Sequence, residues 1–122
     1  MKALITLFIL HSSFFALYAQ DIAGMFNQGE QKKNSGDYHT AIGFYTKVLN
    51  SEPAHLNALL QRAFCYSIEK NYQAAIDDYT KVIAAHPDHI WAYISRGSAY
   101  NKLKKFDVAL TDFDKALSLN PA

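Results

Sequence analysis

The chain has 122 residues, 50% apolar and 14% aromatic, a composition that excludes a disordered or low-complexity protein. Twelve basic residues against eleven acidic ones give a net charge of +1, so we expect neither nucleic acid nor an anionic membrane surface among its partners. The single cysteine excludes an intramolecular disulfide and any zinc site built from several cysteines, and the sequence contains no glycine-rich phosphate loop.

The first nineteen residues have the order of a secretory signal peptide. Lys2 supplies a positive charge, a mostly apolar run extends from Ala3 to Leu10, a second run extends from Phe14 to Ala19, and the polar residues Gln20 and Asp21 follow. We therefore predict a signal peptide over residues 1–19 and a mature domain over 20–122, exported to a bacterial-type periplasm or secreted. A retained anchor is the alternative, although a bilayer span needs about 20 apolar residues; after cleavage we expect no membrane span.

The rest of the sequence repeats itself with a period of 34 residues. The register holds over two shifts without an insertion, which defines units at 22–55, 56–89 and 90–122. The clearest columns are Tyr38/Tyr72/Phe106, Ala41/Ala75/Ala109, Tyr45/Tyr79/Phe113 and Pro53/Pro87/Pro121.

Each unit is expected to form two antiparallel helices, because its apolar residues recur at spacings of three and four. Asp37 and Asn71 are expected to cap the second helices, and Asp21 and Asp88 the first helices of units one and three. Small residues recur at the expected helix crossings, where an aromatic side chain of the opposite helix can fill the space. The expected helices are 22–35, 38–51, 56–69, 72–85, 90–103 and 106–119.

These columns resemble the tetratricopeptide repeat. Its pattern of aromatic, small and closing proline residues is best matched in unit three, by Tyr93, Gly97, Tyr100, Phe106, Ala109, Phe113, Ala116 and Pro121. The resemblance covers residues 22–122 and implies an all-α fold, an α-solenoid of three antiparallel helix pairs wound into a right-handed superhelix. It also implies a non-enzymatic interaction module or adaptor that binds a peptide or partner segment in a concave groove.

The resemblance assigns the groove to the first helix of each unit. The implied groove residues are Phe26, Glu30, Lys33, Asn57, Leu60, Phe64, Ser67, Trp91, Ile94, Ser98 and Asn101. One subclass of the family clamps the carboxylates of a chaperone tail with Lys, Asn, Asn, Lys and Arg. None of the five columns matches, since they hold Phe26, Glu30, Gln61, Trp91 and Ser95. Trp91 either anchors a partner in the groove or packs on the neighbouring helix.

Arginine and aspartate occur together in two units and are absent together in the other. Arg62 and Arg96 are each followed sixteen residues later by an aspartate, Asp78 and Asp112, whereas unit one has neither. This pattern favours a structural bridge between the two helices of one unit. A bridge across units, from Arg96 to Asp78, and two unrelated solvated charges remain the alternatives.

No catalytic, metal or cofactor site is expected. Cys65 lies between two aromatic residues and is interpreted as a buried, inert thiol. His86, Asp88 and His89 surround a proline and could suggest a metal site, but His55 occupies the same repeat column as His89, which favours a role in the turn.

The second helix of unit three carries an apolar face that no later unit covers. Leu110 and Leu117 occupy the columns of Ile76 and Ile83, and we expect them to be clearly more exposed. The alternative function is therefore a structural or assembly component of an envelope complex that self-associates, as a homodimer for example, through this uncapped C-terminal helix. A solvated edge that is simply tolerated remains open.

Overall fold

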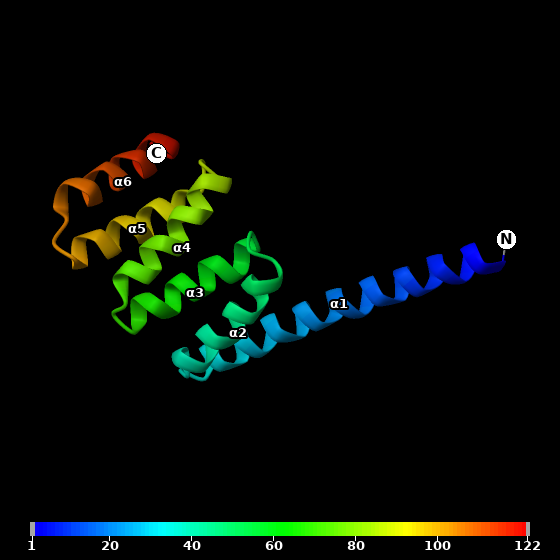
Figure 1. The fold of residues 1–122 in the computed structure, drawn as a ribbon. Helices are drawn as coiled ribbons and strands as arrows, with labels where there is room; N and C mark the ends of the chain where they lie inside the picture. Colours follow the sequence, from blue (N-terminus) through cyan, green and yellow to red (C-terminus); the bar gives the residue numbers. More distant parts are fainter. Residues whose placement is uncertain (1, 122) are drawn as a thin grey trace.

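A computed structural model describes the backbone of residues 2–121 and the side chains of residues 13–121. Six helices and no strand occur in this part of the chain. They stack side by side in chain order into a helical solenoid (Figure 1), which confirms the expected all-α fold. The helices are α1 (Lys2–Asn34), α2 (Tyr38–Ser51), α3 (Leu56–Ile68), α4 (Tyr72–Ala85), α5 (Ile90–Lys102) and α6 (Phe106–Leu119).

The first helix is longer than expected. Helices α2 to α6 match their expected ranges to within one residue, but α1 begins at Lys2 instead of near residue 22. Residues 2–23 contain neither glycine nor proline and are rich in Ala, Leu and Phe, so nothing interrupts the helix before the first repeat. Asp21 consequently lies inside a helix and does not cap one.

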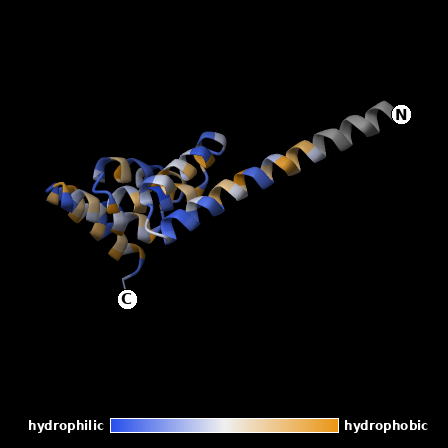
Figure 2. Cartoon of the chain, turned by 90° about the horizontal axis from the view of Figure 1, so that it is seen from below, coloured by the Kyte–Doolittle hydropathy of each residue, from blue (hydrophilic) through white to orange (hydrophobic). Residues whose placement is uncertain are grey.

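The N-terminal part of α1 projects away from the repeats (Figure 1). Residues 13–20 are all exposed, and Phe14 and Phe15 are each 74% exposed. Figure 2 shows apolar residues along this projecting segment. Among the described residues, no helix is long and apolar enough to cross a membrane. The described part of the leader therefore packs little against the solenoid.

The turn between the two helices of a unit has one geometry in all three units. Gly36, Lys70 and Lys104 stand 34 residues apart and all have positive φ, at 82°, 61° and 60°. In unit one the amide of Asp37 donates to the carbonyl of Lys32 at 2.9 Å, and the same bond recurs in the other units at 2.8 and 2.9 Å. This is the hydrogen bond of a Schellman motif, which satisfies a carbonyl left free at the helix end.

Some helix N-termini are capped by the expected residues and others are not. Asp37 and Asn71 each accept a hydrogen bond from the amide three residues further on, as expected. The prediction for Asp88 is wrong, because its neighbour His89 directly precedes α5. His55 and His89 accept the corresponding amide hydrogen bond through Nδ1 at 3.1 Å, so both histidines have the turn role that their shared column indicated.

Small residues let the two helices of each unit approach closely. Ala41, Ala75 and Ala109 are at most 2% exposed. A methyl group on Gly97 would lie 2.8 Å from Cε1 of Phe113, so the ring of α6 fills the space that the glycine leaves. A methyl group on Gly29 would meet the ring of α2 in the same way, at 2.7 Å. The expected packing of aromatic residues into these notches is confirmed.

Candidate partner-binding surfaces

The residues that the sequence assigns to a groove lie on the first helix of each unit, as expected. Phe26, Glu30 and Lys33 are on α1; Asn57, Leu60, Phe64 and Ser67 are on α3; Trp91, Ile94, Ser98 and Asn101 are on α5. The structure separates them into a group whose side chains bind to each other or pack in the core and a group that is exposed.

The two charged groove residues of α1, Glu30 and Lys33, are already paired with each other. Lys33 donates from Nζ to Oε2 of Glu30 and to Oε1 of Gln61 on α3, both at 2.8 Å. The hydroxyl of Tyr45 donates to Oε1 of Glu30 at 2.5 Å. The pKa of Tyr45 is raised, mainly by burial of its hydroxyl and to a smaller extent by this hydrogen bond. The cation of Lys33 is thus neutralised within the protein, which leaves little attraction for a ligand carboxylate at this end.

Phe26 and Leu60 contribute to the core as well as to the surface. Both are half-buried and pack against the buried cluster. The ring of Phe26 stacks on His55 with centroids 5.3 Å apart and packs against Tyr45 at 5.7 Å. These two side chains therefore belong in part to the core, and only part of their surface is open to a partner.

Two aromatic side chains remain available. Phe64 is 43% exposed and meets the ring of Tyr38 edge-on at 6.3 Å. Trp91 is 72% exposed, so the alternative that it packs on the neighbouring helix is wrong. Asn57, Ser98, and Asn101 are exposed around them. Trp91 also borders a hollow at the C-terminal edge, lined by Asp88, His89, Ile90, Ile94 and Asn120.

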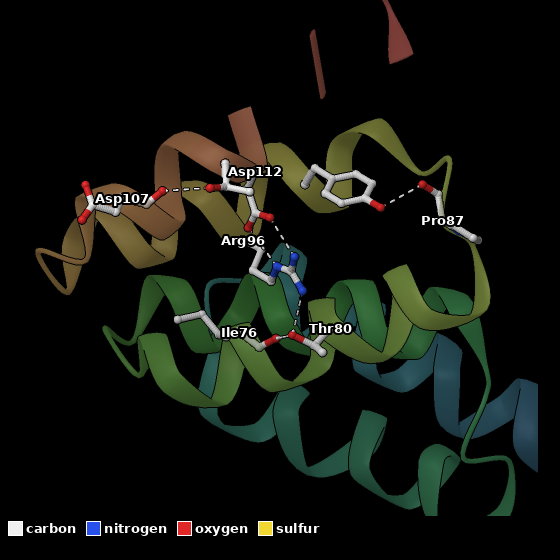
Figure 3. Close-up of polar contacts among 8 residues, drawn as sticks. Ile76, Thr80, Pro87, Arg96, Asp107 and Asp112 are labelled. Atoms are coloured by element: carbon white, nitrogen blue, oxygen red, sulfur yellow. Dashed lines mark hydrogen bonds and ion pairs between the residues drawn. The ribbon is translucent and has the colours of Figure 1, made fainter. Parts of the chain in front are cut away.

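The arginine–aspartate bridges form within the units. Nε and Nη2 of Arg96 donate to the two carboxylate oxygens of Asp112 at 2.8 and 2.7 Å (Figure 3). Nε and Nη2 of Arg62 likewise donate to the two carboxylate oxygens of Asp78, at 2.7 and 2.8 Å. Both aspartates are buried. The structural bridge is confirmed, and the alternative bridge from Arg96 to Asp78 is wrong.

Each arginine also reaches back to the preceding unit, which the sequence reasoning missed. Nη1 of Arg62 donates to Thr46 at 3.0 Å, and Nη1 of Arg96 donates to Thr80 at 3.1 Å (Figure 3). The two threonines stand 34 residues apart, and that shared column is the signal that could have found them. A single guanidinium thus fixes the two helices of its unit and the position of the unit before it.

The C-terminal face is exposed as expected. Leu110 and Leu117 are 59% and 64% exposed, whereas Ile76 is 3% exposed and Ile83 is half-buried. An apolar groove runs between α5 and α6, lined by Ile90, Ile94, Phe113, Ala116, Leu117 and Asn120. This end groove is a second candidate surface.

The described part of the chain has neither an activated cysteine nor a cluster of possible metal ligands. Cys65 is fully buried, and burial raises the pKa of its thiol to about 11, so it stays protonated and unreactive near neutral pH. No group of three or more His, Cys, Asp or Glu side chains in the described part of the chain could hold a metal ion.

The comparisons with known proteins agree on the fold. Tetratricopeptide repeat family models match residues 57–89 and 90–122. The first tetratricopeptide repeat domain of Spaghetti (RPAP3), solved with an HSP90 peptide, SRMEEVD, is 28% identical, with a TM-score of 0.77 over 84% of this chain and 81% of that one. The tetratricopeptide repeat domain of Arabidopsis OM64 is 26% identical, with a TM-score of 0.77 over 84% of each chain.

A bacterial structure is similar as well. MamA from Desulfovibrio magneticus is 28% identical, with a TM-score of 0.78 over 82% of this chain and 56% of that chain. Among curated proteins, none matches the chain. Both candidate surfaces lie on a fold that is typically a scaffold for protein interactions rather than for catalysis.

Proposed function

The chain belongs to the tetratricopeptide repeat family, and on this premise we propose that it is a non-enzymatic adaptor that binds a peptide or partner segment on the surface formed by α1, α3 and α5. The observation that carries the proposal is the exposure of Phe64 and Trp91 on that surface. Aromatic side chains that are exposed in the free protein can bury a large area on binding, as interface anchors do. The similar Spaghetti domain binds a peptide, which supports the same kind of ligand.

We propose further that the ligand is an apolar or aromatic segment. The five clamp columns hold Phe26, Glu30, Gln61, Trp91 and Ser95, which include no cation. The nearby Lys33 is paired with Glu30. An acidic tail such as SRMEEVD would therefore meet no free positive charge at these columns, and its desolvation would be uncompensated.

The experiment is a selection from a phage-displayed library of random peptides, followed by titration monitored through the fluorescence of Trp91, the single tryptophan. We expect the selected peptides to be rich in apolar and aromatic residues. Their affinity should fall at least about tenfold with Phe64→Ala or Trp91→Ala. Binding to Trp91→Ala is measured by calorimetry, because that variant lacks the fluorescent tryptophan. Val108→Ala, an exposed position on α6, is the matched control. Acidic selected peptides, or affinities that neither substitution changes, would contradict the proposal.

We also propose that the protein is exported and that residues 1–19 are removed. The apolar side chains of residues 14, 15 and 17 are exposed, which supports a segment with no place in the folded domain. Asp21 shares its column with His55 and His89, which cap α3 and α5. The shortened first helix would thus begin at a residue suited to cap it.

A second candidate function is assembly. The exposure of Leu117 beside an apolar groove favours it, because exposed apolar surface of this kind often marks an interface. The end groove shares Ile94 with the peptide-binding surface, but Leu117 on α6 lies outside that surface, so substitution of Leu117 tests assembly separately.

A further inference from the structure

We propose that copies of this chain associate head to tail, with α1 of one copy seated in the end groove between α5 and α6 of the next. The inference rests on the second candidate function and specifies its partner as a second copy of the chain. The end groove shares Ile94 with the peptide-binding surface, so the variants that test the inference lie outside that surface. The argument comes from the two internal junctions, α2 with α3 and α4 with α5, which show how this sequence seats one unit on another.

The end groove between α5 and α6 corresponds to the groove between α3 and α4, which another helix of the same chain covers. Moving its lining residues back by 34 gives Leu56, Leu60, Tyr79, Val82, Ile83 and His86. That groove is covered by α5, and Val82 within it is fully buried. Leu49, the unit-one counterpart of Leu117, is 7% exposed, whereas Leu117 is 64% exposed. The end groove therefore has the shape and polarity that accept the first helix of a repeat unit.

Helix α1 carries the face that enters such a groove. At the internal junctions the first helices present Ala58 and Ala92, both fully buried. The α1 residue of this column is Gly24, and a methyl group added there would meet no atom within 4 Å. The face of α1 at Gly24 is thus small and has open space in the direction of an added methyl group, as close approach to the end groove requires.

A donor and an acceptor occupy the same two columns at the proposed junction as at the two internal junctions. Arg62 donates to Thr46 across the first internal junction, and Arg96 donates to Thr80 across the second. The same two columns at the junction between copies hold Gln28 as the donor and Asp114 as the acceptor. Both are exposed in the monomer, so a glutamine amide can donate to the carboxylate of the other copy.

One residue limits the affinity of this junction. Gln31 is exposed on α1, but its column holds Cys65 and Ala99, which are at most 3% exposed. Seating α1 in the end groove would bury the amide of Gln31 where the internal junctions have no polar group. A buried amide without partners is costly, so the association is reversible and Gln31→Ala strengthens it.

The proposed contact joins two different faces, so it is heterologous. After two copies bind, one keeps a free α1 face and the other keeps a free groove, so the assembly grows by addition unless the rotation closes a ring. A twofold dimer through α6 would instead use the same face twice. This difference in symmetry gives the decisive test.

The test measures the mass of the 122-residue chain by sedimentation equilibrium over a range of concentrations. Leu117→Glu blocks the groove, and Gly24→Lys blocks the α1 face at a position where an added Cβ meets no atom within 4 Å. We expect each variant alone to lose association by more than about tenfold. Mixed together they should form a one-to-one dimer, because each retains the face that the other lacks. Gln31→Ala should raise the association constant about fivefold.

Val108→Glu is the matched control, because residue 108 is exposed on α6 nine positions from Leu117 and hence on the opposite side of the helix. It should leave association unchanged. The proposal is overturned if the wild-type chain stays monomeric at millimolar concentration or if Gly24→Lys still assembles as the wild-type chain does. It is also overturned if association survives both blocks, which would place the contact elsewhere, such as on the exposed apolar residues 14–17.

Discussion

Arg96 shows how much of the solenoid's geometry one side chain can fix. Its guanidinium binds both oxygens of Asp112 in its own unit and the hydroxyl of Thr80 in the unit before. The Asp112 side chain is 4% exposed and that of Arg96 16%. A two-point bridge with further hydrogen bonds is the arrangement in which a buried ion pair is best compensated.

Removing one partner of the equivalent pair in unit two should be strongly destabilising. Asp78→Ala leaves the guanidinium of Arg62 half-buried without its counter-charge, and we expect the free energy of unfolding in urea to fall by about 3 kcal/mol. The double variant Arg62→Met, Asp78→Leu should recover most of this loss. The neighbouring exposed Asp77→Ala should change the free energy by less than about 0.5 kcal/mol. Equal effects of Asp77→Ala and Asp78→Ala would disprove the role of the bridge.

The arginine–aspartate bridge was predicted from the sequence, whereas the threonine contact was missed. Arg and Asp appear together in two units and are missing together in the third, which identifies them as partners without any structure. Thr46 and Thr80 are ordinary polar residues of a helix surface by sequence. Their contact depends on how one unit is rotated against the next, and no residue pattern within a unit encodes that rotation.

The turns between the two helices of units two and three each contain a lysine with positive φ. Lys70 and Lys104 adopt the left-handed conformation that Gly36 adopts in unit one. A side chain in this conformation brings Cβ close to the following carbonyl, which costs about 1–2 kcal/mol. The turn geometry itself is kept, because the hydrogen bond across it is the same in all three units.

Replacing one of these lysines with glycine should stabilise the protein. For Lys104→Gly we expect a gain of about 0.5–1 kcal/mol, since the relief of strain exceeds the entropy lost by glycine on folding. Lys81→Gly, at an exposed position within α4, should instead cost about 1 kcal/mol. Thermal and urea unfolding of both variants measure the difference. A loss of stability in Lys104→Gly would show that the turn is not strained.

The helices were predictable because their limits follow from the 34-residue period and its prolines. The start of α1 was not, because a signal-like segment without breakers is also a good helix former. The cap of α5 was misassigned for a related reason. Aspartate is the commoner cap residue, so Asp88 was preferred by type, whereas the position directly before the helix belongs to His89.

For the whole molecule, the exposed N-terminal segment leads to a prediction about processing. Produced in a bacterial host, the protein should be recovered from the periplasm with Gln20 as its first residue, because the apolar run directs export and the small Ala19 allows cleavage. Ile5→Arg interrupts the apolar run and should keep the uncleaved chain in the cytoplasm. N-terminal sequencing of fractionated cells measures both results. Intact wild-type protein starting at Met1 in the cytoplasm would contradict the proposal.

The sequence placed the candidate groove residues on the correct helices but could not tell which were available. Lys33 looks like a free surface cation until Gln61, on another helix, is seen to bind it. Phe26 likewise looks like an anchor until its stacking on His55 is seen. Availability depends on contacts between side chains of different helices and turns, which the repeat pattern does not give.

The solenoid's connectivity also determines how the chain can fold. The extensive helix interfaces all join helices that are consecutive along the chain, from α1 with α2 to α5 with α6. No distant segments need to meet before stabilising contacts form, so the entropy of loop closure is small at every step. Proteins with such local contacts fold in microseconds to milliseconds. Folding of this chain can therefore begin at any helix pair and extend in both directions, one helix at a time.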